Sequence, residues 1–327
     1  MLKVLYACGN NSNALIQCSR FLKAMSGTSH TIKVAAYRRS SPNMSIDWTL
    51  DSLLNIFKPD TISLDNENFN IYFEQVKHYA PDLIICDAEY FTSYIANTLN
   101  ITLWQCSSSL INTAIENKEK YNLGLHKQYS FLLGNNNAIR HQRQVNIIDN
   151  SNCNFVYSHF GDTENPPTLK NGFEWIRPYH SVGKEAITCK HNVVAGTLNN
   201  KTIYNILKKY PDSVAFTTFC DEQYNNFLLK DIDNDEEYFC NLKNSNLFVC
   251  EGQTSFLADA FYNNKFSIVF PNYKDIECIM NSIFSEHLGL SKSISETNED
   301  LNKFMNKDIV SNYNKDIQYL HDRINSL

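Results

Sequence analysis

Short apolar runs alternate with amphipathic segments along the chain. In the first half, runs rich in apolar and β-branched residues lie at positions 3–8, 31–37, 81–88, 101–106 and 153–160. Between the first two runs, residues 14–25 place apolar side chains at the three- and four-residue spacing of a helix. Continuous apolar strands that alternate with helices predict a parallel sheet covered on both faces.

The same alternation restarts after a polar segment, residues 161–171, which contains a proline pair. Strands are predicted at 191–196, 213–219, 245–252 and 266–271, and helices at 202–211, 254–262, 274–288 and 299–326. The chain is therefore predicted to be an α/β protein with two Rossmann-like domains, residues 1–165 and 166–327. The last helix is placed so that it can pack back on the first domain.

Composition narrows the class of protein. Hydrophobic residues make up 43% of the chain and charged residues 20%, as in folded globular proteins. Because no apolar stretch reaches the roughly 18–20 residues of a membrane span and no signal peptide is evident, we expect a cytoplasmic protein without a membrane span. The ten cysteines are scattered without a CxxC pair, which predicts neither disulfides nor a metal site. With a net charge of −6, the chain could meet a nucleic acid only through a local basic patch.

The most specific pattern lies between residues 247 and 281. A buried-type strand ends at Glu251 and Gly252, and a helix begins at Thr254 and Ser255. A helix N-terminus presents N–H groups without partners, so a phosphate can bind there, and Asp259 lies one turn further on, within reach of a ribose hydroxyl. The alternative is that Thr254 and Ser255 only cap the helix.

This segment resembles the donor-binding motif of GT-B glycosyltransferases, closest to the MurG-like and UDP-glucuronosyltransferase-like branch. The matching residues are Gly252, Ser255, Asp259, Ala260, Lys265, Pro271, Glu277 and Asn281. The chain departs from the motif at four positions: Glu251 and Asn264 stand where glycines are common, Asp259 replaces glutamate, and Cys278 stands where that branch often has glutamine.

The resemblance implies a GT-B fold, two Rossmann-like domains facing each other across a cleft. It also implies a nucleotide-sugar co-substrate, UDP-linked, with no metal and no other cofactor. It assigns the donor contacts to Gly196, Thr197, Glu251, Gly252, Gln253, Thr254, Ser255, Asp259, Glu277 and Asn281.

A catalytic base is predicted in the first half. Residues 81–104 are similar to a family segment in which Asp87 and Glu89 follow a parallel strand, at the end where open α/β sheets bind ligands. Many relatives carry a histidine base near the position of Gln17, and glutamine cannot take a proton at neutral pH. We therefore expect Asp87 first, and Glu89 second, to deprotonate the acceptor hydroxyl. An N-cap of the following helix is an equal alternative for Asp87.

The acceptor is assigned to the first domain. The predicted contacts are Asn11 and Asn13, after the first strand, and Arg38 and Arg39. Cationic side chains beside aromatic ones suit phosphate contact and base stacking, so one candidate acceptor is the 5-hydroxymethyl group of a modified pyrimidine in double-stranded bacteriophage DNA. A solvated charged face, or an acceptor that is a lipid, polysaccharide or small molecule, remains open. Arg177 could contact a phosphate or form a salt bridge between domains.

Two other functions fit the same sequence. A nucleotide-sugar epimerase would use the same fold and the same donor site. A catalytically inactive GT-B binding protein would account for Gln17 and Glu251, which depart from the family pattern.

Overall fold

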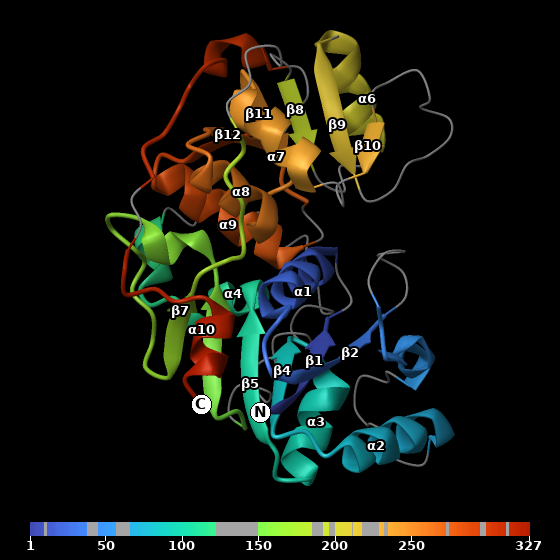
Figure 1. The fold of residues 1–327 in the computed structure, drawn as a ribbon. Helices are drawn as coiled ribbons and strands as arrows, with labels where there is room; N and C mark the ends of the chain where they lie inside the picture. The colour runs from blue at the N-terminus through green and yellow to red at the C-terminus, as the bar shows by residue number, and fades with distance from the viewer. Residues whose placement is uncertain are drawn as a thin grey trace.

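Two parallel sheets organise the chain into two α/β domains (Figure 1). The structure is a computed structural model and describes residues 1–9, 12–37, 45–56, 66–121, 150–184, 192–195, 200–210, 212–217, 229–231, 235–272, 275–294, 299–311 and 314–327. Every strand pair described is parallel, as the continuous apolar runs predicted.

The first sheet has the strand order β3-β2-β1-β4-β5-β6-β7. Its strands are β1 Lys3–Cys8, β2 Thr31–Ala36, β3 Trp48–Thr49, β4 Leu83–Asp87, β5 Thr102–Ser107, β6 Cys153–Tyr157 and β7 Phe173–Ile176. Successive residues of β1 point to opposite faces, because side chains alternate along a strand. Val4 and Tyr6 enter one apolar core, whereas Leu5 and Ala7 enter the other. Both faces are therefore buried.

Helices cover these two faces. They are α1 Ser12–Met25, α2 Glu67–Tyr79, α3 Tyr90–Thr98 and α4 Ile111–Ala114. Helix α2, which the sequence analysis did not predict, begins where the Asn66 side chain accepts a hydrogen bond from the Asn68 N–H at 3.0 Å. It ends at Ala80, which has left-handed backbone with φ of 49°. Among the helices described, not one has the length and apolar character needed to cross a bilayer.

The second sheet has the strand order β10-β9-β8-β11-β12-β13. Its strands are β8 Asn192–Ala195, β9 Ser213–Thr217, β10 Leu229–Asp231, β11 Leu247–Cys250, β12 Ser267–Val269 and β13 Ser291–Ser293. Its helices are α6 Asn200–Lys209, α7 Asp235–Asn244, α8 Thr254–Tyr262 and α9 Ile276–His287. Helix α8 is buried along its whole length, since it packs against its own sheet and faces the first domain.

An apolar contact joins the two domains. Ile111 and Ala114 of α4 share one buried cluster with Met280 and Phe284 of α9, and Phe160 of the first domain completes it. All five side chains are fully buried. Removing this surface from water favours a fixed closed arrangement of the two domains.

The C-terminal segment differs from the long helix predicted over 299–326. The structure has a short 3-10 turn at Leu301–Phe304 and a helix, α10, only at Leu320–Asn325. Leu301 and Ile309 pack on the second domain from an irregular strap, in which Asn306 has a φ of 57° that a helix does not allow. The apolar spacing therefore reflected packing against one surface and not helical periodicity.

The chain leaves the first sheet later than residue 165. Strand β7 adds the last strand at Phe173–Ile176, and α10 returns to pack Leu320 and Ile324 into the core shared with α1 (Figure 1). The first structural unit thus extends past the predicted boundary and includes the C-terminal helix.

Asp162 holds the C-terminal segment against the first domain through hydrogen bonds. Its buried carboxylate accepts two hydrogen bonds from Arg177, at 2.9 Å and 2.7 Å, and one from the Asn314 N–H at 3.1 Å. The Tyr262 hydroxyl at the end of α8 donates to the same carboxylate at 2.5 Å. Of the two uses proposed for Arg177, the structure shows a salt bridge, but it lies within the first structural unit and not between the domains. This bond to Asp162 raises the pKa of Arg177.

Replacing Arg177 with methionine is expected to lower the free energy of unfolding by about 3 kcal/mol, because the Asp162 carboxylate would stay buried without its cation. The matched control is Arg323→Met, which breaks the solvent-exposed pair with Glu174 and is expected to cost less than about 1 kcal/mol. Urea unfolding measures both values. Equal costs would show that Asp162 does not depend on its partner.

Candidate functional site

Helix α1 of the first domain faces α8 of the second. Asn13, Gln17 and Arg20 follow one another at intervals of four and three residues, so they lie on one face of α1. Opposite them, Ser255 and Asp259 lie one turn apart on α8. All five side chains are buried, although each is polar or charged. We call these five residues the α1–α8 seam.

Asn13 joins the two domains at one end of the seam. Its Oδ1 accepts hydrogen bonds from the Ser255 N–H at 3.0 Å and from the Ser255 hydroxyl. Its Nδ2 donates to the Ser108 hydroxyl at 2.7 Å and to Glu277 Oε1 at 3.1 Å. Asn13 was predicted to contact an acceptor, yet here it contacts two residues that were assigned to the donor.

Gln17 occupies the middle of the seam. Its Nε2 donates to the Ser255 hydroxyl at 2.6 Å, and its Oε1 accepts from the Tyr157 hydroxyl. Tyr157 also accepts from the Tyr179 N–H at 2.6 Å. Both ends of the amide therefore have partners, and Gln17 acts here as a connector between the domains.

Arg20 and Asp259 form a buried ion pair at the other end. The guanidinium donates to both carboxylate oxygens, at 2.9 Å and 3.0 Å, in a bidentate arrangement. It also donates to the Tyr179 carbonyl at 3.1 Å and lies 5.1 Å from the Phe239 ring. Asp259 is wholly excluded from solvent. Asp259 was predicted to contact the ribose of the donor, but in this structure both of its carboxylate oxygens are bonded to Arg20.

The turn before α8 packs its backbone closely against α9. Gly252 has a φ of 90°, and a Cβ there would lie 2.8 Å from the Cys278 carbonyl. Asn281 supports the turn, since its Nδ2 donates to the Gly252 carbonyl at 3.0 Å and to the Thr254 hydroxyl at 2.9 Å. The N-cap, Gln253, gives the helix no side-chain cap bond. Among the described residues, the buried Oδ1 of Asn281 has no hydrogen-bond partner.

Asp87 and Glu89 differ in their surroundings although both are buried. Glu89 caps α3, because its carboxylate accepts from the N–H groups of Phe91 at 3.2 Å and Thr92 at 2.7 Å. The Tyr37 hydroxyl donates to it as well, at 3.0 Å. The capping role offered for Asp87 therefore belongs to Glu89, two residues later. Burial raises the pKa of Glu89.

Asp87 lies at the carboxyl end of β4, and burial raises its pKa to about 7. A hydrogen bond from Ser107 opposes this rise by stabilising the carboxylate. A carboxyl group with a pKa near neutrality can accept a proton from a substrate and release it again. Of the two carboxyls predicted to be the base, Asp87 has the environment that suits the role.

Glu277 brings a second buried carboxyl to the same place from the second domain. Burial, together with the neighbouring charges of Asp275 and Asp87, raises its pKa to about 8, although a hydrogen bond from Ser108 opposes the rise. The charge of Asp87 thus acts on Glu277 from the other domain. At neutral pH Glu277 carries its proton, and Asp87 is about half ionised. Paired carboxyls with separated roles are typical of acid–base sites.

Five predicted site residues, Asn11, Arg38, Arg39, Gly196 and Thr197, lie outside the described residues. Glu251 is described, and it is buried at the end of β11. The sequence analysis did not select Ser107, Ser108 or Arg20. The spacing of Asn13, Gln17 and Arg20, which places three polar residues on one face of α1, was the available signal for Arg20. Nothing in the sequence placed the two serines beside Asp87 and Glu277.

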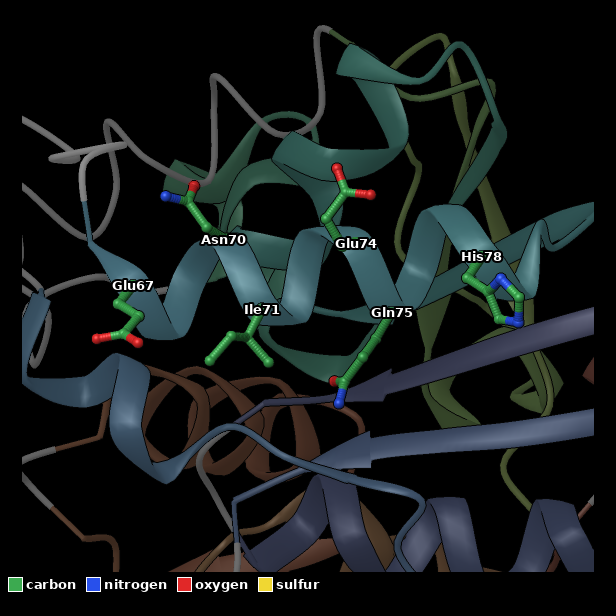
Figure 2. A pocket seen from close by; sticks show the side chains of 6 residues that line it. All are labelled: Glu67, Asn70, Ile71, Glu74, Gln75 and His78. Atoms are coloured by element: carbon green, nitrogen blue, oxygen red, sulfur yellow. The ribbon is translucent and has the colours of Figure 1, made fainter.

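A pocket of about 710 Å³ lies elsewhere, along the outer side of α2. Figure 2 shows its lining side chains, all from that one helix: Glu67, Asn70, Ile71, Glu74, Gln75 and His78. It contains no residue of the predicted site. In the described part of the chain, no group of three or more His, Cys, Asp or Glu side chains is arranged to hold a metal ion.

No protein-family model matches the sequence, and no curated protein matches it. Solved structures do match. The SsfS6 glycosyltransferase of Streptomyces sp. SF2575 is 10% identical, with a TM-score of 0.54 over 91% of this chain and 89% of that one. The spinosyn forosaminyltransferase SpnP is 12% identical, with a TM-score of 0.55 over 93% and 89%.

The chain has the GT-B fold. This confirms the fold predicted from the donor motif and the two parallel sheets. The spinosyn rhamnosyltransferase SpnG matches too, 11% identical with a TM-score of 0.51 over 90% and 86% of the two chains. SsfS6 and SpnG have both been solved with thymidine diphosphate bound. At these identities the GT-B likeness concerns the fold, and the activity of this chain depends on its own residues.

Replacing Asp87 with asparagine is expected to stabilise the protein increasingly as pH rises. The carboxyl has a pKa of about 7 in the folded protein, against an ordinary value of 3.8 for an aspartate in water, so between these limits the folded state binds more protons. The free energy of unfolding of the parent therefore falls with rising pH across this range, and the variant lacks that contribution. Urea unfolding at pH 5 and pH 8 measures the difference. A difference that is constant with pH would contradict the raised pKa.

Proposed function

We propose that this GT-B chain is a glycosyltransferase that transfers a sugar from a nucleotide-sugar donor to an acceptor hydroxyl. The observation that carries the proposal is that two buried carboxyls, Asp87 of the first domain and Glu277 of the second, are bonded to the adjacent serines Ser107 and Ser108. Glu277 also accepts from the Thr254 N–H in the first turn of α8, at 3.4 Å. A donor of an acyl or phosphoryl group could also bind at the N-terminus of α8. The donor motif, however, resembles that of the MurG-like and UDP-glucuronosyltransferase-like branch, which favours a sugar donor. The donor is proposed to be UDP-linked on that resemblance.

The reaction follows from the position of these groups. Asp87 takes the proton of the acceptor hydroxyl, and the oxygen attacks the anomeric carbon of the sugar. The bond from that carbon to the diphosphate oxygen breaks, and the diphosphate leaves with the electron pair. First-turn N–H groups of α8 stabilise the charge on the leaving diphosphate. The protonated Glu277 can donate a hydrogen bond to a sugar hydroxyl. The donor is consumed as co-substrate, and the scheme uses no metal.

A small hydroxyl-bearing molecule is the acceptor that we propose. Among the matched structures, SpnG has been solved with spinosyn aglycone. The DNA acceptor rested on Arg38 and Arg39, which lie outside the described residues, so it stays a prediction. Hydroxymethylated DNA should therefore be tested as one of the acceptors, beside small hydroxyl-bearing molecules.

A catalytically inactive binding protein is the second candidate. The observation that favours it is that two of the predicted donor contacts, Ser255 and Asp259, are bonded to side chains of α1. Such a protein would bind a nucleotide or nucleotide sugar without turning it over. Product analysis with and without acceptor separates transfer from binding alone, and it also detects epimerisation of the donor.

Asp87→Asn is expected to lower the transfer rate at least a hundredfold, because the amide cannot accept the proton. In the parent the rate is expected to rise with pH through about 7, as Asp87 loses its proton. Initial rates against pH, with UDP- and TDP-linked sugars as donors, measure both effects.

Donor affinity is the control, since Asp87 lies in the first domain and its replacement is expected to leave nucleotide binding intact. Unchanged turnover by Asp87→Asn would exclude it as the base. Nucleotide binding without any turnover across the donor and acceptor panel would favour the binding protein.

A further inference from the structure

The groups expected to hold a nucleotide sugar already have partners within the protein. The Ser255 N–H, in the first turn of α8, donates to Asn13 at 3.0 Å. The Asp259 carboxylate is bonded through both oxygens to Arg20. Both partners come from α1, a helix of the other domain. Asn13 and Arg20 lie seven residues apart, so both contacts come from one face of α1, and Asn13 lies in its first turn.

We propose that α1 is an internal competitor for the donor site: the Asn13 amide oxygen occupies the place of a diphosphate oxygen, and donor binding displaces it. This inference rests on the proposed function and specifies how the same site is regulated. The chemical class of the displacing ligand is a nucleoside diphosphate, free or linked to a sugar.

The chemistry of the two acceptors supports the exchange. An amide oxygen carries a partial negative charge and accepts from a helix N–H as a phosphate oxygen does, but it is neutral. A charged oxygen forms a shorter hydrogen bond that is roughly twice as strong, and the helix dipole adds to the difference. A diphosphate can therefore displace Asn13, while water alone does not open the buried contact.

The packing elsewhere keeps the displacement local. Ile111 of α4 and Phe284 of α9 hold the two domains together through an apolar cluster that does not include the seam. Tyr262, at the far end of α8, is bonded to Asp162 of the first domain. These two contacts remain when the first turn of α1 moves. The first turn of α8 can therefore exchange its partner without separation of the domains.

The test compares nucleoside diphosphate affinity in two variants with opposite expected effects. Asn13→Ala removes the competing oxygen and is expected to tighten binding of UDP or TDP by about three- to tenfold, the value of one net hydrogen bond. Asn13→Asp places a charged oxygen opposite the Ser255 N–H and is expected to weaken binding. Isothermal titration calorimetry with each free nucleotide measures the dissociation constants, and thermal unfolding verifies that each variant is folded.

Tyr262→Phe is the matched control. It removes one buried hydrogen bond between the domains and leaves the first turn of α8 unaltered, so binding is expected to stay as in the parent. If Tyr262→Phe binds the nucleotide more tightly by the same factor as Asn13→Ala, local competition is overturned, and a general loosening of the domain interface explains both variants.

The outcomes separate the inference from the function on which it rests. If the parent binds the nucleotide and Asn13→Ala binds it equally well or more weakly, the competition is overturned, whereas the proposed donor site still stands. If neither nucleotide binds the parent or Asn13→Ala, the proposed function fails, and the competition fails with it.

Discussion

The bidentate pair between Arg20 and Asp259 governs how the two domains meet. Both charges are removed from water, and burial of this kind is tolerated only when each charge is fully paired. The pairing fixes the position of α1 along α8, because the guanidinium has to reach both carboxylate oxygens. Once that register is set, Gln17 and Asn13, which lie one and two turns before Arg20 on α1, come to lie opposite Ser255. The remaining seam contacts follow from helical geometry.

The same register brings the chemistry of the two domains together. Asn13 links Ser255 to Glu277, and the charge of Asp87 contributes to the raised pKa of Glu277. Exclusion of water raises the pKa of both carboxyls toward or above neutrality, which a solvent-filled cleft would not do. A closed interface thus gives Asp87, the proposed base, a pKa near neutrality, and it also occupies groups of the proposed donor site. The proposed displacement of Asn13 reconciles these two requirements.

The sequence predicted those features that depend on local pattern. Continuous apolar runs such as residues 81–88 gave buried parallel strands, and the Gly252 turn was found because glycine and a helix start stood together. The C-terminal strap was predicted as a helix, since spacing alone does not distinguish a helix from a segment packed on one surface. The partners of Arg20 were beyond prediction, because the contact joins residues 239 positions apart across two domains.

Hydrogen–deuterium exchange of α1 and α8, with and without saturating UDP or TDP, tests the central claim most directly. In the free protein the first turn of α8 is expected to exchange slowly, since the Ser255 N–H donates to Asn13, and the first turn of α1 is expected to exchange slowly because Asn13 and Ala14 are buried. With nucleotide bound, we expect the first turn of α1 to exchange faster while the first turn of α8 stays protected by its new partner. Equal protection of α1 with and without a nucleotide that binds would contradict competition between α1 and the donor.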